Sequence, residues 1–441
     1  MSAVNTTEVS SEANGTAVEP GPAEVEAGVH AIADRSRTAA RRLAGANRAW
    51  KDRGLLAMAE NIVAKQDLVL AANAEDVRTG RSRGTTDAML DRLTLTPERI
   101  EGLADALRML ASLADPVGSV ARGQTLPNGL RLRQVHVPLG VVGAIYEARP
   151  NVTVDIAGLA LKSGNAVILR GGSAAANTNS VLVDIIRGAL DAVGLPADAV
   201  QSVDHYGRAG ANALMKARGR VDVLIPRGGR DLIQTVLKNA AVPVIETGEG
   251  NVHIYLDESA PVDMAVDILL NSKTQRPSVC NTVETLLVHS GAAATPDVLA
   301  ALAGAGVRLH VDERVRAVLP AGIQAEPATD EDWGREYMNL DLAVAMVDDM
   351  DQALSHIRRW TTGHTEAILT NDLANAERFI AEIDSAAVIV NASTRFTDGG
   401  ELGLGAEVGI STQKMHARGP MGLRELTTTK WIVQGEGQIR A

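Results

Sequence analysis

Residues 137–173 read VPLGVVGAIYEARPNVTVDIAGLALKSGNAVILRGGS. Two short apolar runs in this stretch, at 141–146 and 166–169, predict strands, because continuous apolar runs of this length are typical of strands buried on both faces. Between them, residues 154–161 predict a helix. A strand, a helix and a second strand in this order form the unit of a parallel sheet, so the stretch predicts an α/β fold.

The same alternation of short strands and helices continues through most of the chain. Up to residue 245 we expect helices at 178–192, 209–217 and 231–239, and strands at 200–203, 221–225 and 242–245. A second series has strands at 252–256, 283–288, 307–311, 343–347, 366–370 and 387–391, with helices at 262–270, 296–303, 313–318, 350–360 and 373–383. The pattern predicts two parallel-sheet domains.

The segments outside this alternation have other patterns. Residues 25–113 have helical spacing of Ala and Leu, and 118–138 predict a hairpin around Pro127-Asn128-Gly129. After residue 391 the chain is rich in glycine, and residues 427–433 predict a final strand.

Composition excludes several classes of protein. With 441 residues, 45% of them hydrophobic, the chain can bury a large core. A net charge of −11 and only 2% aromatic residues argue against a nucleic-acid or anionic-membrane surface. Residues 1–22 contain no Lys, Arg or apolar run, so we expect a disordered tail and no secretory signal. No apolar stretch is long enough to span a bilayer, and the histidine spacings predict no metal site.

Cys280 is the only cysteine, so no intrachain disulfide can form, which fits a reducing cytoplasm. Its neighbours Lys273 and Arg276 would favour the thiolate, the nucleophilic form of the side chain. The alternative is that Cys280 is a buried, inert thiol and the two cations are solvated loop residues.

Further candidate residues follow the expected strands, where the ligand crevice of a parallel sheet lies. The turns Arg170-Gly171-Gly172-Ser173 and Arg227-Gly228-Gly229 could hold phosphate groups through backbone amides and arginine side chains. Neither turn matches the G-x-G-x-x-G fingerprint, and both could be ordinary tight turns. Asn151, after the first strand, could stabilise an oxyanion or be a turn residue.

Five motifs carry a resemblance to a known family. They are VPLGVVGAIYEARPNVT at 137–153, VIETGEGNVH at 244–253, KTQRPSVCNT at 273–282, WTTGHTEAILT at 360–370 and NASTRFTDGGELGLGAEVGISTQKMHARGPMGL at 391–423. With these motifs the chain resembles the aldehyde dehydrogenase superfamily, in particular its branch that acts on gamma-glutamyl phosphate. The resemblance implies an aldehyde-dehydrogenase-like α/β fold with two parallel-sheet domains and a β oligomerisation arm.

The implied domains have the following boundaries. Residues 24–117 and 140–251 would form a Rossmann-like NADP-binding domain, and 252–391 a catalytic domain containing Cys280. Residues 118–139 and 392–441 would form the oligomerisation arm and C-terminal segment, with 1–23 as the tail.

The resemblance also assigns roles to single residues. Cys280 matches the nucleophile and Asn151 the oxyanion-stabilising asparagine. The implied cofactor contacts are Arg170, Gly171, Ser173, Gly228, Gly229, Glu246 and Glu336. Glu246 matches the base that activates water in hydrolytic relatives. In the implied reaction the acyl group is exchanged with phosphate and not with water, so we expect no hydrolytic role for Glu246. The candidates for substrate binding are Arg149, Lys273, Arg276, His364 and Arg395.

The implied reaction is the NADPH-dependent reduction of L-glutamyl 5-phosphate to L-glutamate 5-semialdehyde and phosphate through a Cys280 thioester, in proline biosynthesis. The resemblance also implies a homo-oligomer, a dimer or a tetramer. Residues 1–24 are too few for a fused glutamate 5-kinase, so we expect any channelling to involve a separate kinase. Two alternatives are a dehydrogenase for another semialdehyde and a cofactor-binding scaffold protein without activity.

Overall fold

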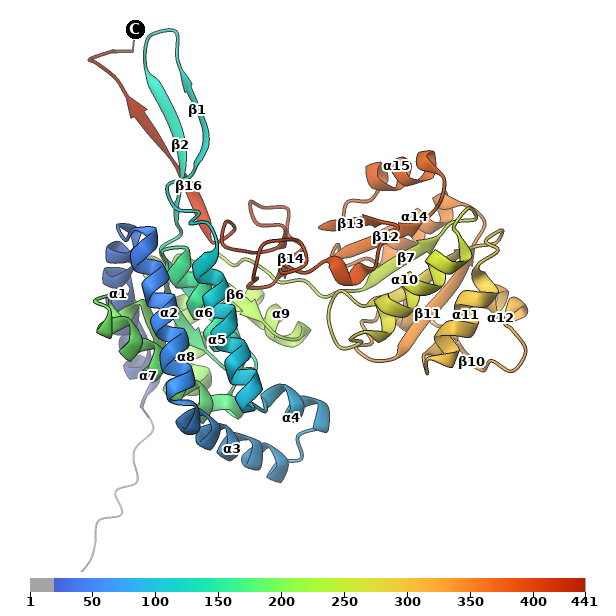
Figure 1. The fold of residues 1–441 in the computed structure, drawn as a ribbon, viewed down its shortest axis with the longest axis horizontal. Coiled ribbons are helices and arrows are strands. Elements are labelled where there is room, and N and C mark those ends of the chain that lie inside the picture. The colour runs from blue at the N-terminus through green and yellow to red at the C-terminus, as the bar shows by residue number, and fades with distance from the viewer. Residues whose placement is uncertain (1–19, 441) are drawn as a thin grey trace, which may run out of the picture.

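The computed structural model describes residues 20–440 and shows two lobes and a projecting arm (Figure 1). Of the expected tail, residues 1–19 lie outside the described residues. The tail boundary at residue 23 is wrong, because the first helix, α1, already begins at Pro22. Proline is favoured there because its missing N–H would have no partner in the first turn.

The N-terminal helical region is confirmed and packs around the first sheet. It contains α1 (Pro22–Ala44), α2 (Arg48–Ala64), α3 (Gln66–Ser82), α4 (Asp87–Leu93) and α5 (Pro97–Ser112). Asn47 caps α2 by accepting a hydrogen bond from the Trp50 backbone, and Thr96 caps α5 in the same way through Arg99. None of the helices within residues 20–440 combines the length and apolar character that crossing a membrane requires.

The first sheet has four parallel strands in the order β5-β4-β3-β6. They are β3 (Val141–Tyr146), β4 (Ala166–Arg170), β5 (Val200–Ser202) and β6 (Val223–Arg227), connected through α6 (Pro150–Lys162), α7 (Ala176–Ala192) and α8 (Gly207–Lys216) and followed by α9 (Arg230–Asn239). The strand order reverses between β3 and β6, and ligands of such sheets bind beyond the strand ends at this switch point.

One expected strand of this sheet is wrong. Residues 242–245 form only a single bridge, from Val244 to Leu224. The physical reason is Pro243, which has no N–H to donate and therefore interrupts a ladder.

The second sheet has seven parallel strands in the order β10-β9-β11-β8-β7-β12-β13. The strands are β7 (Val252–Leu256), β8 (Val283–His289), β9 (Arg308–Val311), β10 (Ala325–Pro327), β11 (Asp341–Val347), β12 (Thr365–Leu369) and β13 (Ala387–Val390). The helices are α10 (Val262–Thr274), α11 (Thr295–Gly304), α12 (Glu313–Val318), α13 (Asp330–Trp333), α14 (Met350–Trp360) and α15 (Leu373–Glu382). Sequence patterns missed β10 and α13, which are too short to show a period. The predicted α/β class with two parallel sheets is confirmed.

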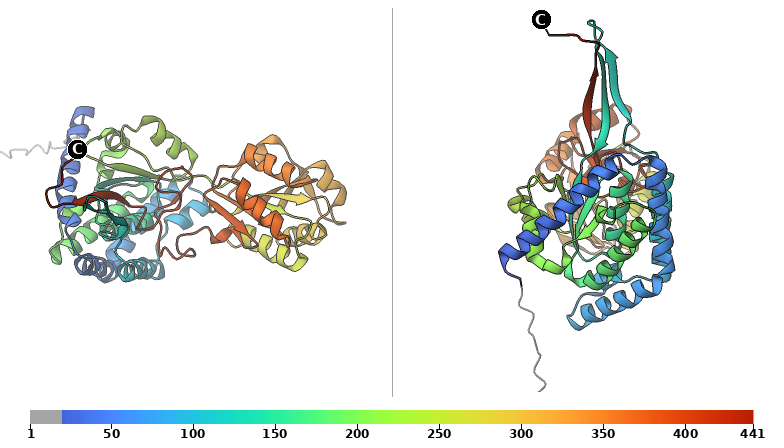
Figure 2. Two further views of the ribbon diagram at one scale, coloured as in Figure 1. Left: turned by 90° about the horizontal axis from the view of Figure 1, so that it is seen from above. Right: turned by 90° about the vertical axis from the view of Figure 1, so that its left-hand side faces the viewer.

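The arm is a three-stranded antiparallel sheet in the order β1-β2-β16. The expected hairpin is confirmed as β1 (Val120–Thr125) and β2 (Arg131–Pro138), and its turn contains Gly129 at φ +87°. β16 (Thr427–Gln434) returns from the far end of the chain to pair with β2 along its length. Figure 2 shows that this sheet extends away from both lobes, and the short strands β14 (Ile410–Ser411) and β15 (Gly419–Pro420) lie nearer the body.

A buried ion pair joins α10 to β8. Lys273 lies in the last turn of α10, beyond the expected helix end at residue 270, and its Nζ donates to Glu284 Oε2 at 2.6 Å and to the Val283 carbonyl at 2.8 Å. Both side chains are fully buried. Burial lowers the pKa of Lys273 and raises that of Glu284, while the contact between the two opposes both shifts.

We expect Lys273→Met to lower the free energy of unfolding by about 3–5 kcal/mol in urea titrations, because it leaves the Glu284 carboxylate buried without its partner. Arg358→Ala is the matched control. It breaks an exposed pair with Glu382 and should leave the stability nearly unchanged, because solvent screens exposed ion pairs. Equal stability of Lys273→Met and the unchanged protein would contradict a structural role for Lys273.

Candidate active site

Two neighbouring cavities lie between the lobes, and we call the space they form the crevice. One, of about 220 Å³, is lined by α9 residues, the 246–249 segment, Thr362 and Thr412. The other, of about 510 Å³, shares Arg230 and Glu249 with it and reaches Glu336. The crevice therefore lies between the C-terminal ends of the strands in the first sheet and residues that precede strands of the second sheet.

Cys280 lies beside the crevice in the turn between α10 and β8, and its side chain is partly exposed. The 246–251 segment packs directly on this turn, since a Cβ added to Gly250 would lie 1.5 Å from the Cys280 carbonyl oxygen. The Gly250 N–H donates to Glu336 Oε1 at 3.1 Å. The fold thus brings together Cys280, Gly250 and Glu336, which are distant in sequence.

The surroundings of the Cys280 thiol oppose its ionisation. Burial raises its pKa to about 12; the nearby carboxylates of Glu336 and Glu407 raise it as well, and Arg227 lowers it. The effect expected of Arg276 stays a prediction. The Lys273 ammonium is held by Glu284, and its charge is not available to the thiol.

Arginines gather around this turn, and we call them the arginine cluster: Arg92, Arg149, Arg227, Arg276 and Arg395. Burial lowers the pKa of Arg149, and Arg92 and Arg227 lower it further by repulsion. Within residues 20–440 no member of the cluster forms an ion pair with a carboxylate, whereas other arginines such as Arg37 do. Such a group is suited to bind an anion.

Arg92 was missed by sequence reasoning. It comes from α4, and its Nη2 donates to the Ser278 carbonyl at 3.2 Å, two residues before the cysteine. No motif surrounds it in the sequence, so only the fold reveals its position.

Asn151 lies in the first turn of α6, directly after β3, and is exposed. Its Nδ2 donates to Asp155 Oδ2 at 3.3 Å. Burial raises the pKa of Asp155 to about 6, and Arg227 opposes that shift. Its role as oxyanion donor remains a prediction.

The expected cofactor turns lie at the ends of β4 and β6. Arg170 Nε is buried without a hydrogen-bond partner, and the Gly171 N–H donates to Asp204 at 2.7 Å. Ser173 begins the short helix that leads into α7. At the other turn, the Gly229 N–H donates to Glu147 Oε1 at 2.7 Å, and a Cβ on Gly228 would meet the same carboxylate.

Glu246 and Glu336 both line the crevice. The Glu246 N–H donates to Gln413 Oε1 at 3.0 Å, and its Oε2 accepts from Gln413 Nε2 at 3.3 Å. Burial raises the pKa of both glutamates. Arg170 Nε keeps a free donor for an anionic ligand, whereas the Gly171 and Gly229 amides are occupied by Asp204 and Glu147.

Among the expected substrate residues, Arg149 and Arg395 are partly exposed and Arg276 is exposed. Lys273 and His364 are fully buried. Burial lowers the pKa of His364 to about 4, so it is neutral, and its Nδ1 lies 2.8 Å from Thr365 Oγ1. Neither reaches the crevice surface, so we do not assign them direct contact with substrate.

A buried network behind the crevice was also missed. The Glu366 carboxylate bonds His253 Nδ1 at 3.0 Å and the Thr361 hydroxyl. The next residue, Thr362, donates from its hydroxyl to the Glu249 carbonyl at 2.6 Å and accepts from the Asn251 N–H at 3.1 Å. The network therefore fixes the segment that packs on Cys280, and its sequence signal is the TTGHTE motif.

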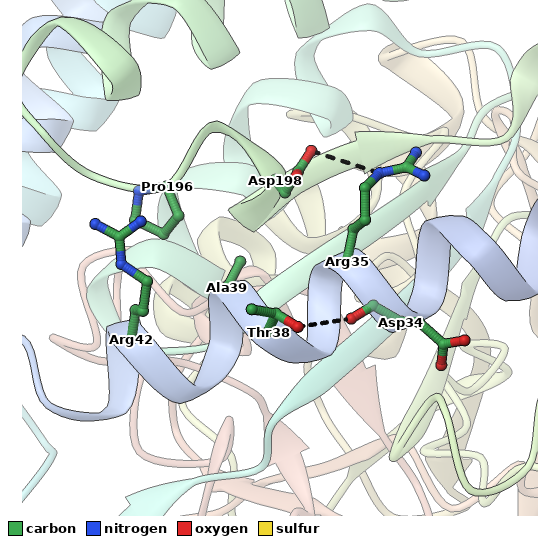
Figure 3. Close-up of a pocket in the computed structure, with 7 residues that line it drawn as sticks. All are labelled: Asp34, Arg35, Thr38, Ala39, Arg42, Pro196 and Asp198. Carbon is green, nitrogen blue, oxygen red and sulfur yellow. Dashed lines mark hydrogen bonds and ion pairs between the residues drawn. The ribbon is translucent and has the colours of Figure 1, made fainter.

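A separate surface pocket of about 360 Å³ lies between α1 and residues 196–198 (Figure 3). Its arginines are already engaged: Arg35 pairs with Asp198 at 3.9 Å, and Arg42 donates to the Gly194 carbonyl at 3.4 Å. It contains no nucleophile and we assign it no function. No group of His, Cys, Asp and Glu able to hold a metal occurs among residues 20–440.

The chain belongs to the aldehyde dehydrogenase family, whose model matches residues 1–322. Its relatives include gamma-glutamyl phosphate reductases. The protein of Kineococcus radiotolerans is 58% identical over 426 residues, which cover 96% of this chain and 99% of the relative. The protein of Leifsonia xyli subsp. xyli is 63% identical over 401 residues, which cover 90% of this chain and 94% of the relative. The crystal structure of gamma-glutamyl phosphate reductase from Thermotoga maritima matches with a TM-score of 0.91 and 44% identity, covering 94% of this chain and 100% of that one.

We expect Gly250→Ala to reduce turnover by about 10²-fold or more, because its Cβ would displace the Cys280 turn or the 246–251 segment. Gly188→Ala, where nothing lies within 4 Å of the added Cβ, is the control and should keep full turnover. Circular dichroism would check that both variants are folded. Normal turnover in Gly250→Ala would contradict the tight packing.

The raised pKa of Cys280 predicts slow alkylation by iodoacetamide at pH 7. The rate should rise about tenfold per pH unit between pH 7 and 9 without a plateau, because the thiolate fraction increases tenfold per unit below the pKa. In denaturant the pKa should return towards the ordinary 9.0. Because Cys280 is the only cysteine, intact-mass spectrometry measures its alkylation directly. A plateau below pH 8 in the folded protein would contradict a neutral thiol.

Slow alkylation of the free protein fits both an enzyme and a binding protein. Turnover is therefore the measurement that separates the two.

Proposed function

We propose that the protein reduces L-glutamyl 5-phosphate with NADPH to L-glutamate 5-semialdehyde and phosphate, in the synthesis of proline from glutamate. Relatives 58–63% identical carry the name gamma-glutamyl phosphate reductase. The observation that carries the proposal is a single thiol beside arginines without carboxylate partners. An acyl phosphate offers an electrophilic carbon to the thiol and an anion to the arginines.

In the first step the Cys280 sulfur attacks the acyl carbon and loses its proton as the bond forms. The phosphate departs with that proton, held by Arg227 and Arg276. This order suits a thiol with a raised pKa, because the sulfur loses its proton only as the bond forms and needs no prior ionisation. The side-chain amide of Asn151 donates to the developing oxyanion.

When bound, NADPH would supply the hydride that reduces the thioester carbon. Arg170, Gly171 and Ser173 would hold the adenosine side, with the Arg170 guanidinium as the contact for a 2′-phosphate, and Gly228 and Gly229 the pyrophosphate. Aldehyde dehydrogenases use nicotinamide cofactors, and the choice of NADPH over NADH is part of this proposal. Glu336 would contact the nicotinamide ribose.

Collapse of the thiohemiacetal releases the semialdehyde and restores the thiol. Glu246 does not act as a base for water in this scheme, because hydrolysis would discard the thioester. Its hydrogen bonds to Gln413 support a role in shaping the crevice.

The proposal extends to the partners. Exposed Val120, Trp431 and Val433 on the arm support association with further copies of the chain, as a dimer or tetramer. Acyl phosphates are labile, which supports delivery by a separate glutamate 5-kinase. The single cysteine supports a reducing compartment, the cytoplasm.

We expect NADP⁺ reduction with glutamate 5-semialdehyde, formed from pyrroline-5-carboxylate, to require inorganic phosphate. Cys280→Ala should abolish it, and Asn151→Ala should reduce it by about two to three decades through loss of one oxyanion donor. Turnover that is independent of phosphate, or full activity in Cys280→Ala, would overturn the proposal.

A further inference from the structure

One acidic side chain interrupts an otherwise buried helix. In α6 every residue from Val152 to Lys162 is buried except Asp155, which is partly exposed. Asn151 stands one turn earlier, so the two side chains share one face of the helix. The face that carries the expected oxyanion donor is therefore also the face that carries a carboxylate.

The Asp155 carboxylate is largely without partners. Its one hydrogen bond in the described part of the chain comes from Asn151 Nδ2 at 3.3 Å. Arg227 is close enough to influence its charge, yet the two do not form an ion pair. A carboxylate that is removed from water needs hydrogen-bond donors from the protein. Among the described residues Asp155 has one such donor, the Asn151 side-chain amide.

Three carboxylates near the thiol or the glycine turns accept hydrogen bonds from the backbone. Glu336 accepts from the Gly250 N–H, Glu407 from the Gly399 N–H at 2.9 Å, and Glu147 from the Gly229 N–H. Asp155 accepts none from the backbone, and its one hydrogen bond comes from the side chain of the expected oxyanion donor.

The substrate of the proposed function carries two anionic groups and one α-ammonium. The arginine cluster suits the anions, but no arginine can accept a hydrogen bond from an ammonium. The site therefore needs a hydrogen-bond acceptor for the ammonium.

We propose that Asp155 accepts the α-ammonium group of the substrate and so selects 2-amino semialdehydes over semialdehydes without an amino group. This inference rests on the proposed function, because it takes its ligand from it.

The test compares two aldehydes, glutamate 5-semialdehyde and 5-oxopentanoate, which lacks the amino group, each with NADP⁺ and phosphate. For Asp155→Asn we expect kcat/KM with glutamate 5-semialdehyde to fall about 10- to 100-fold, the range for a lost charged hydrogen bond. With 5-oxopentanoate kcat/KM should stay within about twofold of the unchanged protein. Asp155→Asn should therefore lose most of the preference for glutamate 5-semialdehyde over 5-oxopentanoate.

Asp348→Asn, which breaks an exposed pair with Arg314, is the control and should leave both values unchanged. A parallel loss with both aldehydes in Asp155→Asn would assign Asp155 a structural role and overturn the inference alone. If the unchanged protein oxidises neither aldehyde in a phosphate-dependent way, the proposed function fails and the inference falls with it.

Discussion

The close approach of Gly250 to the carbonyl of Cys280 is the constraint on which the site depends. Residues 246–251 lead from the first sheet into β7, so the segment that connects the lobes also packs against the Cys280 turn. Glu336 holds this segment from one side and Thr362 from the other. Correct formation of the second sheet therefore sets the distance between the thiol and the crevice.

Charge is arranged so that the free site resists ionisation of the thiol while it attracts an anion. The arginines of the cluster repel one another, which lowers the pKa of Arg149 and Arg395. Burial and nearby carboxylates raise the pKa of the Cys280 thiol. A thiol with a raised pKa is less open to oxidation and alkylation, because the thiolate is the reactive form.

The sequence predicted most of the fold, because continuous apolar runs such as 141–146 and 252–256 leave little alternative to buried parallel strands. It failed at 242–245, where Pro243 breaks the ladder, and at β10, which is too short. The sequence could not assign every site residue, because a motif shows which residues are neighbours in the chain but not where their side chains point. Lys273 and His364 lie within motifs but point into the core, and Arg92 lies outside every motif but reaches the Cys280 turn.

The arm has a consequence for synthesis of the chain. The hairpin β1–β2 is made before either parallel sheet is complete, whereas β16 follows β13, the last strand of the second sheet. During translation β2 therefore exposes an unpaired edge that β16 later covers along its whole length. Such an edge pairs readily with other chains, so the nascent protein carries a temporary aggregation hazard that ends only when its last strand arrives.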